Sequence, residues 1–145
     1  MTKPDPSSLH KVSRPVVLVT AAVLIDKDNQ ILLAQRPQGK SMAGLWEFPG
    51  GKVHENEIPE EALVRELREE LGIKTDPGCL VPLTFASHSY PEFHLLMPLY
   101  ACRVWRNTPH PQEGQAIAWA KKDEVYKYPM PPADEQILPV LFELI

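Results

Sequence analysis

Three glutamates near the middle of the chain stand at a spacing that suits metal chemistry. Glu66, Glu69 and Glu70 lie three or four residues apart, so a helix would place them on one stripe of its surface. Like charges at this spacing repel by about a few tenths of a kcal/mol per pair. A hard divalent cation relieves that repulsion and lets a polyphosphate approach the carboxylates. The stretch therefore predicts a metal site for phosphate chemistry, with a solvated acidic helix face as the alternative.

The residues around these glutamates predict the helix that holds them. Its expected range is Pro59 to Leu71, because proline suits the first turn of a helix and Gly72 follows as glycine commonly does after the last turn. A glycine loop at Gly50 and Gly51 comes before it. One stripe of the helix is apolar at helical spacing and needs a core to cover it, namely Leu63, Val64, Leu67 and Leu71.

The same stretch resembles the Nudix box. Eight specified positions of that motif are matched over the 23 residues from Gly51 to Ile73, which makes the signal highly specific. Other segments are similar to the MutT-type branch of this family, which clears oxidised nucleoside triphosphates, and the likeness runs from Val16 to the C-terminus. These segments are Ala34–Pro37, Gly44–Lys52, Glu113–Gln115 and Pro132–Glu135.

The resemblance implies a metal centre and a set of catalytic residues. Mg²⁺ is the expected ion, with Mn²⁺ as a substitute, and its expected ligands are the Gly50 carbonyl, Glu66, Glu69, Glu70 and Glu113. The catalytic residues implied are Arg65, Glu66, Glu69 and Glu113. The general base stays open between Glu66 and Glu113.

The resemblance also implies residues that contact the nucleotide. Plainer alternatives are a surface position for Arg36, a connecting loop for Ser41, a core position for Phe48, and a helix N-cap for Asp134. Several MutT-type relatives carry asparagine at the position of Asp134. An ionised aspartate suits the two donors of guanine, whereas a protonated one suits cytosine. The full expected set is Arg36, Ser41, Glu47, Phe48, Pro49, Gly50 and Asp134.

The activity that follows from this resemblance is hydrolysis of a nucleoside triphosphate to the monophosphate and pyrophosphate. The first expected substrate is 8-oxo-dGTP, whose removal sanitises the nucleotide pool, serves DNA replication and repair, and avoids mutation. CTP or dCTP is the alternative substrate. A non-catalytic Nudix binding module is a remote alternative.

The rest of the chain predicts an α/β protein with the Nudix fold, a mixed β-sheet sandwiched between helices. Residues 1–14 are expected to form a flexible tail and residues 15–145 the single Nudix domain. Val16–Ile25 and Gln30–Arg36 are predicted to pair as a hairpin, and Pro98 to mark an edge or bulge. Further strands are expected at Leu80–His88, Phe93–Trp105 and Ala116–Trp119, and helices at Lys121–Tyr126 and Ala133–Ile145.

Charge and composition limit the expected partners. The net charge is −4, and 7 of the 19 acidic residues fall between Glu55 and Glu70, which argues against binding a nucleic acid polymer. The expected partner is a small nucleoside triphosphate. No run of about 18 apolar residues predicts a membrane span. Cys79 and Cys102 lack metal-ligand spacing and suit buried reduced thiols, so a cytoplasmic location is expected. A monomer is expected as the oligomeric state.

Overall fold

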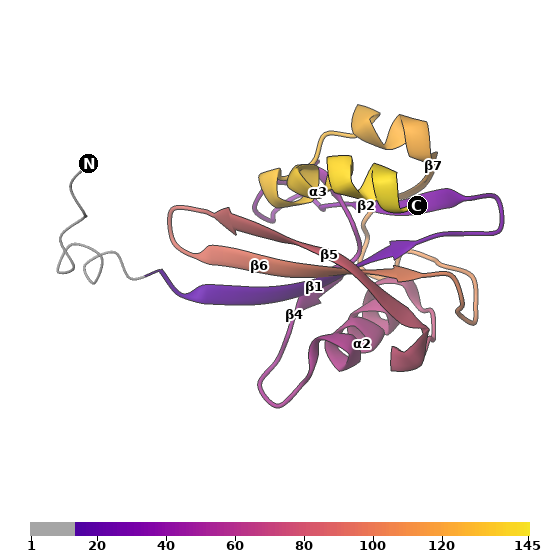
Figure 1. Ribbon diagram of the computed structural model, residues 1–145, viewed down its shortest axis with the longest axis horizontal. Helices are drawn as coiled ribbons and strands as arrows, with labels where there is room; N and C mark the ends of the chain where they lie inside the picture. The colour runs from indigo at the N-terminus through magenta and orange to yellow at the C-terminus, as the bar shows by residue number, and fades with distance from the viewer. Residues whose placement is uncertain (1–13) are drawn as a thin grey trace, which may run out of the picture.

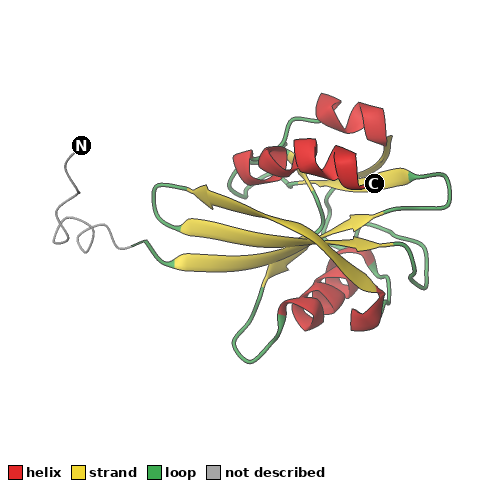
Figure 2. Ribbon diagram, in the orientation of Figure 1, coloured by secondary structure: helices red, strands yellow, loops and turns green. Residues whose placement is uncertain are grey.

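The structure is a computed structural model that describes residues 14–145 (Figure 1). Strands form the middle of the molecule, and helices lie on two opposite sides of them (Figure 2). The tail predicted over residues 1–14 lies outside the described residues except for Arg14. The elements in chain order are β1 (Val16–Leu24), β2 (Gln30–Gln35), β3 (Trp46–Glu47), β4 (Gly50–Lys52), α2 (Pro59–Leu71), η1 (Pro77–Cys79), β5 (Leu80–Ser89), β6 (His94–Cys102), β7 (Ile117–Lys121), η2 (Lys122–Lys127) and α3 (Pro132–Leu144).

The strands form two sheets. The first has the order β4-β1-β6-β5 and is mixed, because β1 runs parallel to β6 while the other pairs are antiparallel. The second has the order β3-β2-β7 and is antiparallel. Helix α2 lies on one side of the strands and α3 on the other (Figure 1). The predicted α/β class, with helices on both sides of mixed sheet structure, is confirmed.

The hairpin predicted for β1 and β2 is wrong. The Asp26 carboxylate accepts hydrogen bonds from the amides of Asp28 (3.0 Å) and Gln30 (2.8 Å), so the turn itself forms as its residues suggest. Beyond it a single bridge joins Ile25 and Ile31, and the two strands then enter different sheets. Each strand pairs with two others from later in the chain, and those partners compete successfully with the local pairing.

Pro98 lies in β6, a central strand, so the edge position expected for it is wrong, whereas the alternative of a bulge is close to what is found, since the β5–β6 ladder shifts register opposite Leu99 and Tyr100. Parallel pairing between β1 and β6 extends to Leu18 and Leu96 and resumes at Ala21 and Leu99 in the same register. The ladder is interrupted at Pro98 because proline has no N–H to donate. A central strand tolerates the proline at the cost of this local gap.

Helix α2 has the bounds predicted for it. At its start the Ile58 amide donates to the Glu61 carboxylate (3.0 Å), and at its end Gly72, with φ of 69°, donates to the Arg68 carbonyl (2.9 Å). The three leucines of its apolar stripe are buried, each contributing about 1.5 to 3 kcal/mol, and Val64 is partly buried. The buried residues of the helix are Ala62, Leu63, Leu67 and Leu71. This packing leaves the glutamates beside β4.

Helix α3 closes the opposite side of the molecule against β5. It begins at Pro132, one residue before the predicted start, and buries Ile137, Leu138 and Leu141. The segment predicted as a short helix near residue 121 is the 3-10 helix η2. Among residues 14–145, none of the helices has the length and apolar character that a membrane span requires.

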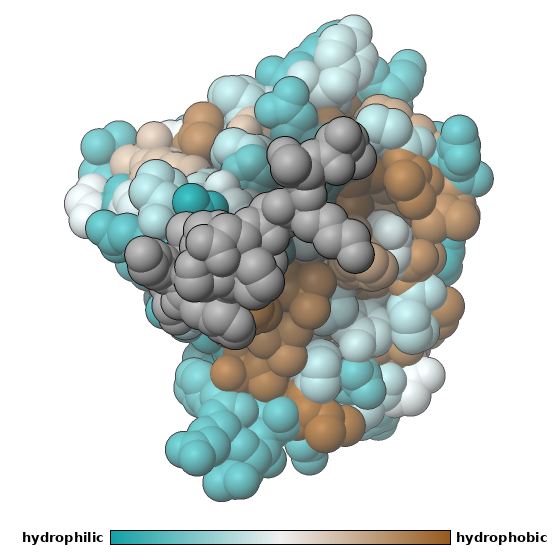
Figure 3. Space-filling view, turned by 60° about the vertical axis from the view of Figure 1, so that its left-hand side comes forward, coloured by the Kyte–Doolittle hydropathy of each residue, from teal (hydrophilic) through white to brown (hydrophobic). Residues whose placement is uncertain are grey.

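Apolar residues gather in places on the face of the molecule drawn in Figure 3. Over the whole surface, Val16, Val81 and Phe85 are each more than half exposed, at 64%, 54% and 63%. Exposed apolar side chains of this kind are ordinary on protein surfaces. They indicate no binding site by themselves.

Candidate active site

The glycine loop at Gly50 and Gly51 packs tightly between β1 and α2. A Cβ atom on Gly50 would collide with the carbonyl oxygen of Thr20, and one on Gly51 would collide with the carboxyl group of Glu66. Glycine is required at Gly50, where the clash is with the backbone, whereas a side chain at Gly51 would displace the Glu66 carboxyl group. The Gly50 amide donates a hydrogen bond of 3.2 Å to Oε2 of Glu70. The loop therefore contacts two of the predicted metal ligands directly.

Arg65 holds three carboxylates in place. Its Nε and Nη2 donate to the two oxygens of Glu57, at 2.8 and 3.0 Å. Its Nη1 lies 2.9 Å from Oε1 of Glu66 and 3.3 Å from Oε2 of Glu69. The hydrogen bonds from Arg65 lower the pKa of Glu57 to about 2. Arg65 thus holds Glu66 and Glu69, two of the expected metal ligands, together with Glu57.

Glu70 has no basic side chain within 4 Å among residues 14–145. Burial first, and then the negative charges of Glu66, Glu47 and Glu113, raise the pKa of its carboxyl group to about 9. The hydrogen bond from the Gly50 amide acts in the opposite direction. Burial also raises the pKa of Glu66, whereas the hydrogen bond and the positive charge of Arg65 lower it. The structure has assembled more negative charge here than Arg65 balances.

Glu113 reaches this cluster from the loop before β7. Gln115 positions the loop, because its Nε2 donates to the Glu70 carbonyl (2.9 Å) and its Oε1 accepts from the Glu113 amide (2.9 Å). Glu113 and Glu70 line one small cavity of about 120 Å³, together with Glu47, Gly50 and Arg36. Two of the expected ligands, separated by more than forty positions in the sequence, therefore line one cavity.

The predicted ligands fit a hard divalent cation by the type of their donors. The Gly50 carbonyl and the carboxylates of Glu66, Glu69, Glu70 and Glu113 all offer oxygen, which Mg²⁺ and Mn²⁺ prefer. Within residues 14–145, no three acidic, histidine or cysteine side chains already converge on one point. The carboxylates would have to close around the ion, and the ligand set stays a prediction.

A larger cavity of about 510 Å³ extends from the glycine loop to α3. Asp134 is buried in its wall, with 5% of its surface exposed, and its Oδ2 accepts a hydrogen bond of 3.1 Å from the Phe48 amide. Burial raises the pKa of Asp134 to about 7, and the charge of Glu47 adds to the rise. Pro131 occupies the N-cap position of α3, so the alternative of Asp134 as the N-cap is wrong.

Arg36 lies where the two cavities meet. Its Nη1 is 3.2 and 3.1 Å from the two carboxylate oxygens of Glu47. Its Nε donates to the Ser41 carbonyl (2.7 Å) and its Nη2 to the Ser41 hydroxyl (3.3 Å). Burial raises the pKa of Glu47, and the charge of Arg36 opposes that rise. Arg36 is therefore held in a defined place beside the cavities and is not an isolated surface residue.

Phe48 and Pro49 differ in what they contact. The Phe48 side chain belongs to the core and also lines the larger cavity, so a core position does not keep it away from the cavity. Pro49 lines neither the small nor the larger cavity. Its carbonyl accepts a hydrogen bond from the Ala22 amide (2.9 Å), which fastens the loop to β1. The structure does not bring Pro49 to the place expected for a substrate contact.

Sequence reasoning missed part of the wall of the larger cavity. Tyr90 and Phe93 flank the turn between β5 and β6, with ring centroids 5.1 Å apart, and both line the cavity. Thr20 lies there too, and its hydroxyl is buried without a hydrogen-bond partner. An aromatic residue beside a turn has the same sequence signal as a core residue. Tyr90-Pro91-Glu92, which separates the two predicted strands, indicates a turn but does not indicate that Tyr90 and Phe93 line a cavity.

The NUDIX domain family matches this chain over residues 20–139. The CTP pyrophosphohydrolase of Escherichia coli is 42% identical over 130 residues, which cover 88% of this chain and 93% of that protein. The 8-oxo-dGTP diphosphatase of Proteus vulgaris is 43% identical over 89 residues, which cover 61% of this chain and 78% of that protein.

Solved structures show the same likeness. The solution structure of the Escherichia coli ORF135 protein has a TM-score of 0.78 at 36% identity, covering 90% of this chain and 91% of that one. The MutT NUDIX hydrolase from Burkholderia pseudomallei has a TM-score of 0.78 at 28% identity, covering 88% of this chain and 99% of that one. With the glycine loop, the carboxylate helix and these relatives together, the chain belongs to the Nudix family and is a Nudix hydrolase.

Proposed function

We propose that this Nudix hydrolase cleaves nucleoside triphosphates to the monophosphate and pyrophosphate, and that it takes bases with a hydrogen-bond donor beside an acceptor. The observation that carries the proposal is Asp134, which is buried in the wall of the larger cavity beside the carboxylate cluster. The candidate substrates are CTP or dCTP and, second, 8-oxo-dGTP.

The chemistry of a buried carboxyl group supports this choice of bases. In its acid form Asp134 has one O–H donor and one C=O acceptor. Cytosine presents the matching pair, with an acceptor at N3 beside the N4 amine. On its N7 edge 8-oxoguanine presents N7–H beside O6, whereas ordinary guanine has two acceptors on that edge and offers a donor beside an acceptor only at N1–H and O6. Discrimination against guanine therefore requires that Asp134 faces the N7 edge of the base. A pKa near 7 keeps the acid form of Asp134 populated at neutral pH.

The ionised form of Asp134 favours a different base edge. A carboxylate only accepts hydrogen bonds, so it suits N1–H and the amine of guanine. The two protonation states therefore differ in the nucleotides they recognise. Substrate preference should change as the pH rises through the pKa of Asp134, which burial raises to about 7.

The relatives support both candidate substrates. The relative named CTP pyrophosphohydrolase matches 88% of this chain, and the relative named 8-oxo-dGTP diphosphatase matches 61%. We place CTP first because the relative named CTP pyrophosphohydrolase matches more of the chain. This choice reverses the order of the two candidate substrates that was expected from the sequence. If 8-oxo-dGTP is the substrate, the enzyme would sanitise the nucleotide pool and avoid mutation. In either case residues 15–145 would act as one domain on a small nucleotide.

In this proposal the site residues have three separate roles, namely metal binding, positioning of carboxylates and proton transfer. Phosphoryl transition states spread negative charge over the non-bridging oxygens, so catalysis depends on positioning and charge neutralisation. Mg²⁺ or Mn²⁺, held by the Gly50 carbonyl, Glu66, Glu69, Glu70 and Glu113, would supply that neutralisation. Arg65 keeps the carboxylates of Glu57, Glu66 and Glu69 in place. Glu113 or Glu66 receives the proton of the attacking water.

Pyrophosphate release from a panel of nucleotides tests the proposal. With Mg²⁺, kcat/KM for CTP or 8-oxo-dGTP should exceed that for dGTP by about ten-fold or more, since a paired base contact is worth about 1 to 3 kcal/mol. Asp134→Ala should raise KM for the preferred nucleotide by a similar factor, while Asp134→Asn keeps a donor and an acceptor and should retain the preference. An Asp134→Ala variant that discriminates like the wild type would disprove this role of Asp134.

A further inference from the structure

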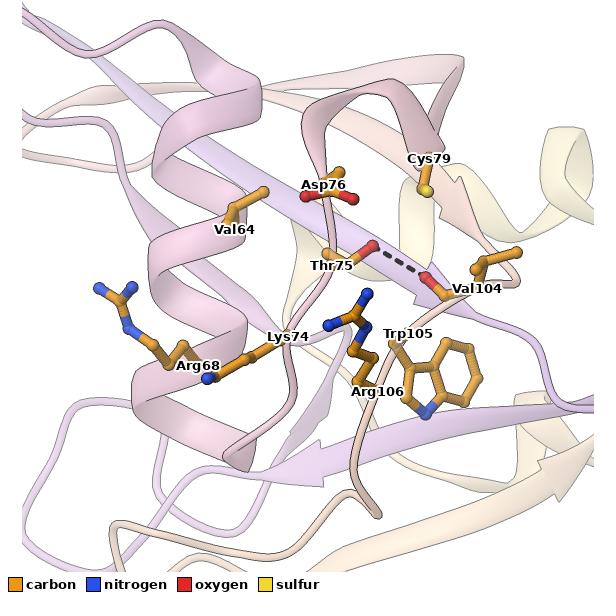
Figure 4. Close-up of a pocket in the computed structure, with 9 residues that line it drawn as sticks. All are labelled: Val64, Arg68, Lys74, Thr75, Asp76, Cys79, Val104, Trp105 and Arg106. Atoms are coloured by element: carbon orange, nitrogen blue, oxygen red, sulfur yellow. Dashed lines mark hydrogen bonds between the residues drawn. The ribbon is translucent and has the colours of Figure 1, made fainter.

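A cavity on the other side of α2 from the glutamates gathers basic side chains. It encloses about 520 Å³ between α2, the segment before β5 and the segment after β6 (Figure 4). Arg68, Lys74 and Arg106 line it, and Trp105 is part of its wall. Asp76 is the one acidic residue in its lining. Nothing in the pyrophosphohydrolase reaction uses this cavity.

The backbone holds two of these basic residues side by side. Lys74 and Arg106 form an antiparallel bridge, in which the Arg106 amide donates to the Lys74 carbonyl (2.8 Å) and the Lys74 amide to the Arg106 carbonyl (3.2 Å). Side chains directly opposite in such a pair leave the same face, with Cβ atoms about 5 Å apart. Like charges at opposite positions are unfavourable. The bridge thus places the backbones of two cationic residues next to each other, and their side chains extend in different directions along the cavity (Figure 4).

The positive charge of the cavity is not balanced locally. Among residues 14–145, no ion pair within 4 Å involves Arg68, Lys74 or Arg106, whereas Arg36 and Arg65 are both paired. Three positive side chains and one carboxylate, Asp76, leave a net charge of 3 − 1 = +2 in the lining. The whole chain has a net charge of −4, so this concentration of positive charge runs against the composition. A bound anion would supply the missing counter-charge.

The cavity also offers a surface for an organic group. The Trp105 indole is partly buried and lies nearly parallel to that of Trp119, with ring centroids 6.3 Å apart and an angle of 19° between the planes. Val64 and Val104 add apolar wall around it. A flat indole beside cations suits a ligand that combines a phosphate with a ring.

We propose that this cavity binds a small phosphorylated molecule, with Lys74 and Arg106 contacting the phosphate, Trp105 contacting the organic part, and Arg68 adding positive charge at the edge of the cavity. On helix α2, Val64 and Arg68 lie roughly 160° around the axis from Glu66 and Glu70. The cavity and the carboxylate cluster therefore occupy opposite sides of one helix. A ligand in the cavity leaves the candidate active site free, and both sites can be occupied together.

Titration of the metal-free protein tests this site separately from the active site. EDTA removes the ion that the carboxylates need to hold a phosphate, so binding measured in its presence reports the basic cavity. The probes are inorganic pyrophosphate and AMP, followed by amide and indole NMR shifts at low salt. Each should bind saturably below about 10 mM. The shifts should fall on the Trp105 indole N–H and on residues 74–79 and 104–106, and not on residues 47–51.

Matched variants decide whether the cations are responsible. The double variant Lys74→Ala/Arg106→Ala should weaken binding of both probes by about ten-fold or more. Arg103→Ala removes an exposed arginine of the same segment that does not line the cavity, and it should bind within about two-fold of the wild type. Unchanged amide spectra away from the cavity show that each variant is folded. Trp105→Leu should weaken AMP and leave pyrophosphate unchanged if the indole contacts the organic part.

Several results would overturn the proposal. These are the absence of saturable binding, shifts confined to the glycine loop, or equal losses in the Arg103 variant and the double variant. Equal binding of AMP by the wild type and Trp105→Leu would remove the role of the indole. None of these results depends on nucleotide hydrolysis, so failure here is distinguishable from failure of the proposed enzymatic function.

Discussion

The backbone amide of Phe48 donates a hydrogen bond of 3.1 Å to Oδ2 of Asp134, joining residues 86 positions apart in the sequence. The contact ties the short segment between β3 and β4 to the first turn of α3. It fixes the candidate base-reading carboxylate relative to Gly50 and the carboxylate helix. The distance between the base and phosphate ends of a bound nucleotide would thereby be set by one buried hydrogen bond.

This contact leads to a prediction about the dependence of stability on pH. The pKa of Asp134 rises from 3.8 to about 7 on folding, because burial disfavours the charged form. The acid form then stabilises the fold fully below about pH 4, and the contribution is lost as the pH rises through 7. Asp134→Asn remains neutral, so above pH 8 it should be more stable than the wild type by up to about 4 kcal/mol.

Thermal unfolding of both proteins between pH 4 and pH 9 checks this prediction. The two melting temperatures should converge near pH 4 and separate by several degrees at the alkaline end. Asp123→Asn, at an exposed aspartate, should follow the wild type throughout. A difference between Asp134→Asn and the wild type that stays constant with pH would show that Asp134 does not titrate in this range.

Arg65 should act on catalysis by holding carboxylates. Lysine cannot reproduce its paired contact with the two oxygens of Glu57 while also reaching Glu66. Arg65→Lys should therefore lower kcat by about 10- to 100-fold and raise the Mg²⁺ concentration needed for half-maximal activity. KM for the nucleotide should change little. Arg68→Lys, on the same helix without a carboxylate contact, is the control. An unchanged Mg²⁺ requirement in Arg65→Lys would contradict the role of Arg65 in holding the carboxylates.

The contacts favour Glu113 over Glu66 as the general base. Glu66 is engaged by Arg65, whereas Glu113 is exposed and has no basic partner within 4 Å in the described part of the chain. Glu113→Gln should lower kcat by about 100-fold or more with little change in KM. Steady-state kinetics of Glu113→Gln check this, with Glu135→Gln, at another exposed glutamate, as the control variant. If kcat falls only in Glu66→Gln, Glu66 is the base.

Local signals in the sequence were sufficient for the carboxylate helix. Pro59 at its start, Gly72 after its end and the leucines between them each act within a few residues, so the predicted bounds match the structure. The same holds for the turn at Asp26. These features depend on propensity and short hydrogen bonds, which a sequence displays directly.

Features that depend on distant parts of the chain were not predictable in this way. The separation of β1 and β2 into two sheets depends on strands that come much later, and Pro98 in a central strand depends on the same pairing. Burial of Asp134 against Phe48 and the aromatic wall of Tyr90 and Phe93 arise from tertiary packing. A single sequence shows which residues are present there, but it does not show which of them meet.

Glu70 provides the most direct test of metal-dependent pyrophosphate release at this site, because it is partly buried beside Gly50 without a basic partner within 4 Å among residues 14–145. Pyrophosphate release from CTP and from 8-oxo-dGTP should require Mg²⁺ and should fall by about 100-fold or more in Glu70→Gln. Mg²⁺ should raise the melting temperature of the wild type and of Glu143→Gln, at an exposed glutamate, but not that of Glu70→Gln. Two results would contradict metal-dependent pyrophosphate release at this site. One is turnover near the wild-type level in Glu70→Gln at saturating Mg²⁺, and the other is wild-type turnover in EDTA equal to that in Mg²⁺.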